Sequence, residues 1–185
     1  MSRKIVKPIT AKYLQNAATF YLERYPSTAE GLRRVLNRRV RKAEMAETPI
    51  IDDVKQTIDA IVAKFVGAGV VDDKAFAQTK ARALHRRGTS TRQTRQRLKL
   101  AGIDEETLDQ AMAGLDQELD TDPRRREWQA AVALARRRRL GPFRQKDRKE
   151  LRNRDLAAMA RGGFEYDLAK KVIDAPDPDS LDEPR

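Results

Sequence analysis

The residues with the clearest chemical potential are basic side chains in the middle of the chain. Residues 80–99 contain no acid but hold Lys80, Arg82, Arg86, Arg87, Arg92, Arg95, Arg97 and Lys99. Like charges at this density repel one another unless counterions or a polyanionic partner compensate them. On a helix, Arg92, Arg95 and Lys99 would share one face. The segment is interpreted as a contact surface for nucleic-acid phosphates or an acidic protein groove, with a solvated helix face as the alternative.

A second concentration of arginines follows further along the chain. It comprises residues 124–126 and the run Arg136, Arg137, Arg138 and Arg139. Four consecutive residues cannot share one helix face, because each turns by about 100° from the last. Some of these side chains should therefore meet neighbouring helices or acids such as Asp147 and Glu150. A binding role and a structural role both stay open for this run.

The side chains that catalysis or metal binding needs are scarce. The chain has no cysteine, which excludes disulfides, thiolate metal sites and thiol nucleophiles. Asp72 and Asp73 are interpreted as helix caps rather than metal ligands. His85 is the only histidine and has no partner at ligand or triad spacing, so it is expected on the surface. We predict no catalytic residues, no metal and no cofactor: a binding protein, not an enzyme.

The charge of the chain is unevenly distributed. The 185 residues carry a formal net charge of +11, although residues 174–185 hold five acids and one base. The body before that tail therefore has a larger excess, which favours encounters with polyanions. No apolar run approaches the length of a membrane span, and the N-terminus lacks the apolar core of a secretory signal. We expect a cytoplasmic protein without membrane contact.

Apolar residues recur at helical spacing, and no alternating run reaches strand length. The sequence therefore predicts an all-α fold. Ser27 and Glu30 are spaced as a capping box, and Pro49 stands as the first residue of another helix. Asp104 should cap a third, while residues 146–161 should form a helix near the C-terminus.

A long helix followed by two shorter ones is predicted three times in succession, which is typical of a tandem repeat. The tail is rich in proline and aspartate and is expected to be disordered. The predicted organisation is an N-terminal extension at 1–9, three-helix repeats at 10–70, 71–119 and 120–174, and a disordered acidic tail at 175–185.

Four passages in series give the chain a family resemblance. They are YLERYPS at 21–27, GVVDDKAFA at 69–77, RALHRRGTSTRQTRQRLKLAGI at 82–103 and GFEYDLAKKVI at 163–173. In this order they resemble the RecX regulators of bacterial recombination, over residues 13–174. Two departures are the GTST turn, where many relatives have Gly-Pro, and Glu165, where Ser or Thr is usual.

The resemblance implies a specific fold and partner. It implies three tandem three-helix repeats in an elongated, curved molecule that lies in the groove of the RecA–single-stranded DNA filament. It implies suppression of filament growth, and so of ATP hydrolysis, strand exchange and co-protease activity. We expect a monomer whose binding to single-stranded DNA is electrostatic and non-specific. The alternative is a helical DNA-binding protein of architectural or transcriptional type, because Gly88 and Gly102 have helix-turn-helix spacing.

Overall fold

The computed structural model describes residues 7–181, and within that range the regular structure is helical. It contains nine α-helices and two short 3₁₀ helices, and the only extended pairing described there is a single bridge between Ile9 and Ile50. The all-α prediction is confirmed. The chain divides into two compact units, one ending at Phe76 but including Ala101–Ile103, the other formed by Ala77–Leu100 and the chain from Asp104 onward.

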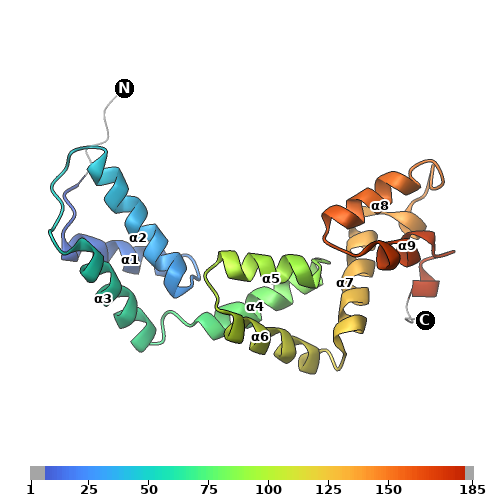
Figure 1. Ribbon diagram of the computed structural model, residues 1–185, viewed down its shortest axis with the longest axis horizontal. Coiled ribbons are helices and arrows are strands. Elements are labelled where there is room, and N and C mark those ends of the chain that lie inside the picture. Colours follow the sequence, from blue (N-terminus) through green and yellow to red (C-terminus); the bar gives the residue numbers. More distant parts are fainter. Residues whose placement is uncertain (1–6, 182–185) are drawn as a thin grey trace. The chain divides into compact units, whose positions relative to one another are not determined.

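The first unit is built on three helices that pack against one another: α1 (Ala11–Leu22), α2 (Ala29–Glu44) and α3 (Val54–Gly67) (Figure 1). Their apolar stripes meet in a core that includes the fully buried Leu14, Leu36 and Ile58. Ile9 joins this core, since its N–H donates to the carbonyl of Pro49 at 2.9 Å. The prediction that residues 1–9 form an extension is therefore wrong at Ile9, while residues 1–6 lie outside the described residues.

Three helix starts differ from those predicted. The cap of α2 is Thr28 rather than Ser27, because the Thr28 hydroxyl accepts the Gly31 N–H at 2.8 Å. Pro49 lies before α3, which begins at Val54, because the chain first pairs Ile50 with Ile9. The helix predicted at 146–161 begins only at Arg152. In each case a contact between distant residues or a local turn outweighs the local signal.

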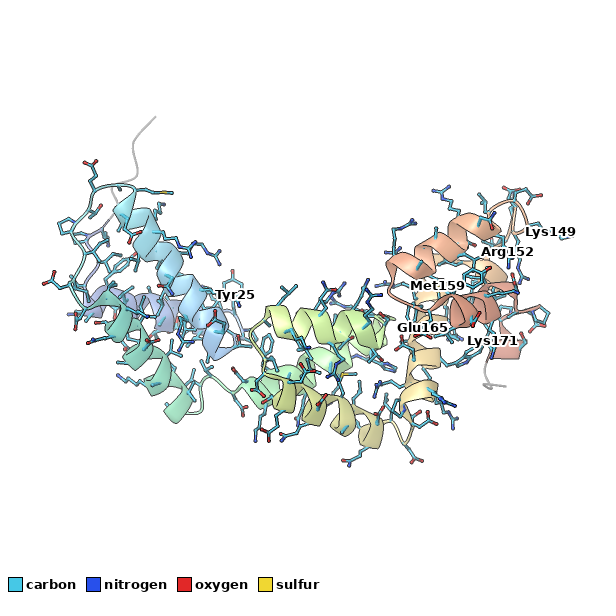
Figure 2. All side chains as sticks on the ribbon, viewed as in Figure 1. Tyr25, Lys149, Arg152, Met159, Glu165 and Lys171 are labelled. Atoms are coloured by element: carbon cyan, nitrogen blue, oxygen red, sulfur yellow. The ribbon has the colours of Figure 1, made fainter. Side chains whose placement is uncertain are left out.

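The second unit contains most of α4 (Asp73–Arg86) together with α5 (Thr91–Leu100), α6 (Glu105–Glu118), α7 (Pro123–Arg138), α8 (Arg152–Arg161) and α9 (Tyr166–Asp174). The largest core lies among α7, α8 and α9, where Ala135, Met159 and Val172 are fully buried. Figure 2 labels Met159 between α8 and α9. Asp104 caps α6 as predicted, accepting the Thr107 N–H at 2.8 Å.

Two junctions within these units use the same device. In the first unit, the Ala29 N–H at the start of α2 donates to Asp73 of α4 at 2.8 Å. In the second unit, the Thr91 N–H at the start of α5 donates to Glu127 of α7 at 2.8 Å. Each time, a carboxylate caps the start of a helix that comes earlier in the chain. This recurrence is consistent with tandem three-helix repeats, whose limits stay a prediction.

The start of the acidic tail is ordered. Leu181, in the 3₁₀ turn η2 (Asp179–Leu181), is buried, and its carbonyl accepts the indole N–H of Trp128 at 3.1 Å. Arg148 donates to the carbonyl of Pro176 at 2.9 Å. The predicted disorder of 175–185 is therefore wrong for residues 175–181, because the composition did not reveal that Leu181 has an apolar site to fill. Residues 182–185 lie outside the described residues.

Asp155 anchors the segment between α7 and α8. It is 1% exposed and accepts hydrogen bonds from Arg144 at 2.7 and 2.8 Å and from the Gly141 N–H at 2.9 Å. Burial opposes its ionisation, but the hydrogen bonds from Arg144 and Gly141 outweigh burial, so the pKa of Asp155 lies below its ordinary value. An aspartate with a lowered folded-state pKa stabilises the fold above its unfolded pKa, and this contribution is lost as pH falls through the folded pKa.

We expect Asp155→Asn to be less stable than the wild type at pH 7 and to lose less stability on acidification. Asparagine accepts fewer hydrogen bonds and leaves the Arg144 charge unpaired, which costs about 1–3 kcal/mol. Urea unfolding at pH 7 and at about pH 3 measures both effects, the lower value lying below the ordinary aspartate pKa of about 3.9. Asp52→Asn is the control, because Asp52 is exposed. Equal acid sensitivity of Asp155→Asn and the wild type would contradict the role assigned to Asp155.

Candidate functional site

The predicted basic segment spans the end of α4, the turn at Gly88 and the whole of α5. Five of its eight basic side chains are exposed and form no ion pair within residues 7–181. We call them the unpaired basic set: Lys80, Arg86, Arg87, Arg92 and Arg97. The turn is tight because Gly88 has φ +67°, a conformation that favours glycine. It leaves Arg86 and Arg87 just before the turn and Arg92 just after it.

The other three basic side chains are compensated by acids of α6. Arg95 pairs with Asp109 at 2.7 Å and also with Glu105, which in turn pairs with Lys99 at 2.6 Å. Arg82 pairs with Glu118. The expected trio of Arg92, Arg95 and Lys99 is therefore split, with Arg92 alone unpaired. All three acids lie on a helix that follows the segment, so inspection of residues 80–99 could not reveal them.

These ion pairs alter the ionisation of their members. Hydrogen bonds from Lys99 and then Arg95 hold the pKa of Glu105 below its ordinary value. Partial burial opposes protonation of Arg95, but hydrogen bonds to Asp109 and Glu105 raise its pKa overall. Glu105 therefore stays charged at neutral pH, so the repulsion inferred within residues 80–99 is partly cancelled from outside the segment.

The four consecutive arginines end α7. Arg136, Arg137 and Arg138 form its last turn, where cations oppose the negative end of the helix dipole. Arg139 ends the helix in a left-handed conformation with φ +54°. The Arg136 guanidinium lies 5.6 Å from the centre of the Phe143 ring. Within residues 7–181, no ion pair joins the exposed side chains of residues 137–139 to Asp147 or Glu150.

Arg126, the last of the arginines at 124–126, is a buried cation, and its burial was not predicted from the sequence. It is 5% exposed, and its guanidinium pairs with Asp116 of α6. It stands four residues before the buried Ala130, so its position on the apolar stripe of α7 could have indicated that it is buried.

His85 is half-buried rather than on the surface as expected. Burial and, to a smaller extent, the charge of Arg126 lower the pKa of His85, so its imidazole is neutral at physiological pH.

Of the two aspartates at the start of α4, Asp72 caps α4 as predicted, whereas Asp73 bonds to the start of α2. Asp72 accepts the Ala75 N–H at 2.9 Å, and Asp73 accepts the Ala29 N–H. Within residues 7–181, no group of three or more histidine, aspartate or glutamate side chains is placed to hold a metal ion. Over the same range, every helix is too short or too polar to cross a bilayer.

Known proteins resemble this chain along most of its length. Residues 72–112 match the family model for the second three-helix domain of RecX. The chain is 40% identical over 171 residues to the regulatory protein RecX of Myxococcus xanthus strain DK1622, covering 91% of this chain and 88% of that protein. It is 30% identical over 162 residues to the regulatory protein RecX of Agrobacterium fabrum strain C58, covering 87% and 82%.

Solved structures share the fold. The crystal structure of RecX from Lactobacillus salivarius superposes with a TM-score of 0.58 at 20% identity, covering 88% of this chain and 94% of that one. A second crystal structure of a regulatory protein RecX gives 0.54 at 21% identity, covering 89% and 71%. The sequence identities over nearly the whole chain, together with the matched helical domain, lead to one conclusion: the chain belongs to the RecX family of regulatory proteins.

Proposed function

We propose that this protein binds the RecA–single-stranded DNA filament and inhibits its ATPase, recombinase and co-protease activities. The observation that carries the proposal is the 40% identity to a regulatory protein RecX over 91% of the chain. The family's name supplies the regulatory role, and the family resemblance supplies the partner. A protein that acts on RecA filaments works where the bacterial chromosome lies, so we infer a cytoplasmic location.

The unpaired basic set supports an electrostatic contribution to this binding. All five members lie within residues 72–112, the segment that matches the RecX domain. Exposed arginines and lysines without acidic partners can replace the counterions of nucleic-acid phosphates, which makes binding salt-dependent and largely independent of sequence. The positive charges of the unpaired basic set would attract DNA phosphates and acidic RecA side chains alike. We propose that Arg136–Arg139 add to this surface.

We expect submicromolar protein to lower the single-stranded-DNA-dependent ATPase of RecA several-fold. Steady-state hydrolysis on circular single-stranded DNA measures this directly. Hen lysozyme at the same concentration is the control, because it is basic but has no RecA-directed surface. An unchanged ATPase rate would overturn the proposal. Tight duplex binding together with an unchanged ATPase would instead favour the alternative of a helical DNA-binding protein.

A further inference from the structure

After α9 the chain continues in a short segment that reaches α7, drawn in dark red in Figure 1. We call residues 175–181 the C-terminal strap. Near its start, the Arg148 guanidinium donates to the carbonyl of Pro176 at 2.9 Å. At its end, Leu181 is buried in the largest core of the second unit, and its carbonyl accepts the indole N–H of Trp128 at 3.1 Å. The strap is therefore fixed to the second unit at both ends.

The strap ends beside two arginines of α7. Arg125 and Arg136 line a cavity of about 190 Å³ together with Trp128 and Leu181. Both arginines are exposed, and no ion pair holds Arg125 among the described residues. Their positions differ by eleven residues, which is close to three helical turns, so they lie on the same side of α7. A polyanion that follows this side of the helix would contact both arginines.

The strap and the residues after it in the sequence are acidic. Asp177 and Asp179 are exposed and join no ion pair in the part of the chain that the structure describes. In the sequence, Asp182 and Glu183 follow Leu181 directly. The burial of Leu181 therefore anchors an acidic stretch of chain at the basic side of α7. The anchor is an apolar contact, which salt does not screen as it screens an exposed ion pair.

We propose that the C-terminal strap competes with single-stranded DNA for Arg125 and Arg136. Carboxylates and phosphates are alternative partners of a guanidinium group. A competitor on the same chain acts at an effective concentration on the order of mM, so even weak contacts of its carboxylates oppose the strand. A strand that binds along this side of α7 displaces the strap and must offset the stabilisation that Leu181 contributes. The choice of single-stranded DNA as the competing polyanion rests on the proposed function.

The first test uses Trp128, which is the only tryptophan of the chain and therefore a specific fluorescent probe of the strap. The full-length protein is titrated with a twelve-residue oligothymidylate, and the quenching of Trp128 by acrylamide is measured at each step. Release of the strap should raise the quenching constant at least twofold. A strand that covered Trp128 without moving the strap would lower it.

The second test compares affinities for the same oligothymidylate at about 0.05 M salt, where charges are little screened. Leu181→Ala removes the apolar anchor without changing any charge, so a general charge effect cannot alter its affinity. We expect Leu181→Ala to bind the strand at least threefold more tightly than the wild type. In an Arg125→Ala/Arg136→Ala background the same substitution should give no gain, because the strap then covers no arginine that the strand uses.

A charge variant keeps Leu181 in its site, so it tests the proposal even if Leu181→Ala fails to fold. It neutralises the four acids of the strap and of the residues after it, and it should also bind the strand at least threefold more tightly. Its matched control neutralises four exposed acids of the first unit that form no ion pair among the described residues, and it should gain less. The two variants are Asp177→Asn/Asp179→Asn/Asp182→Asn/Glu183→Gln and Glu44→Gln/Glu47→Gln/Asp52→Asn/Asp53→Asn.

The proposal is overturned if the strand does not raise the quenching of Trp128. It is also overturned if neither Leu181→Ala nor the charge variant binds more tightly than its control, which would mean that the strap only closes the core over Trp128. Absence of strand binding by the wild type and by both variants would refute it as well. These measurements contain no RecA. An unchanged RecA ATPase would therefore refute the proposed function without refuting the strap, and an inhibited ATPase with no gain in Leu181→Ala would do the reverse.

Discussion

Replacing Gly88 with alanine is expected to destabilise the protein by about 2–5 kcal/mol. Gly88 has φ +67°, and an alanine in the left-handed region costs about 1–2 kcal/mol. A Cβ at this position would also lie 2.7 Å from the Ala130 carbonyl oxygen and against the backbone of Leu134. Helix backbone cannot rotate aside as a side chain can, so overpacking adds about 1–3 kcal/mol. The turn between α4 and α5 rests directly on α7, and only glycine fits there.

Gly69→Ala is the matched control for this prediction. Gly69 has φ +68°, nearly the same conformation as Gly88, but a Cβ there would meet nothing within 4 Å. It should therefore show the conformational cost of about 1–2 kcal/mol alone. Urea unfolding followed by circular dichroism compares the two variants with the wild type. Equal losses would mean that the close approach of Gly88 to α7 adds nothing to stability.

Gly88 also illustrates how much of the fold the sequence could predict. The sequence placed Gly88 at a turn between two helices, because that signal is local. It could not show which backbone the glycine touches, since Leu134 is 46 residues away in the chain. The same division explains the helix starts: Asp104 caps α6 as predicted, because its partner Thr107 is three residues away. Pro49 lies outside α3, because a distant pairing with Ile9 holds that segment extended.

The candidate site follows the same pattern. The basic character of residues 80–99 is a local property, and the structure retains it on α4 and α5. The neutralisation of Arg95 by Asp109 depends on how α5 packs against α6, which periodicity alone does not determine. The buried pair of Arg126 and Asp116 likewise joins two helices. The sequence therefore predicted that the charge of this surface is positive. Only the packing distinguishes side chains that are open to a partner from those already paired with acids.

This distinction predicts different effects for two variants that remove equal charge. Arg86→Ala/Arg87→Ala/Arg97→Ala removes three members of the unpaired basic set, while Arg82→Ala/Arg95→Ala/Lys99→Ala removes the three side chains paired with α6. Each phosphate contact to a single strand contributes a slope of about −0.7 to the dependence of log affinity on log salt. Loss of three contacts should therefore reduce the slope by about 2, and affinity near 0.1 M salt should fall at least tenfold.

The paired variant should keep a salt slope close to that of the wild type, because its side chains release few counterions when they are already held by Glu105, Asp109 and Glu118. Its affinity falls modestly, since the three acids then lack their partners. Fluorescence anisotropy of a labelled oligothymidylate, measured from 0.05 to 0.3 M salt, gives both quantities. Exposed ion pairs contribute at most about 1 kcal/mol each, so both variants should stay folded. Equal loss of slope would show that strand contact depends on total charge and not on which arginines the α6 acids leave free.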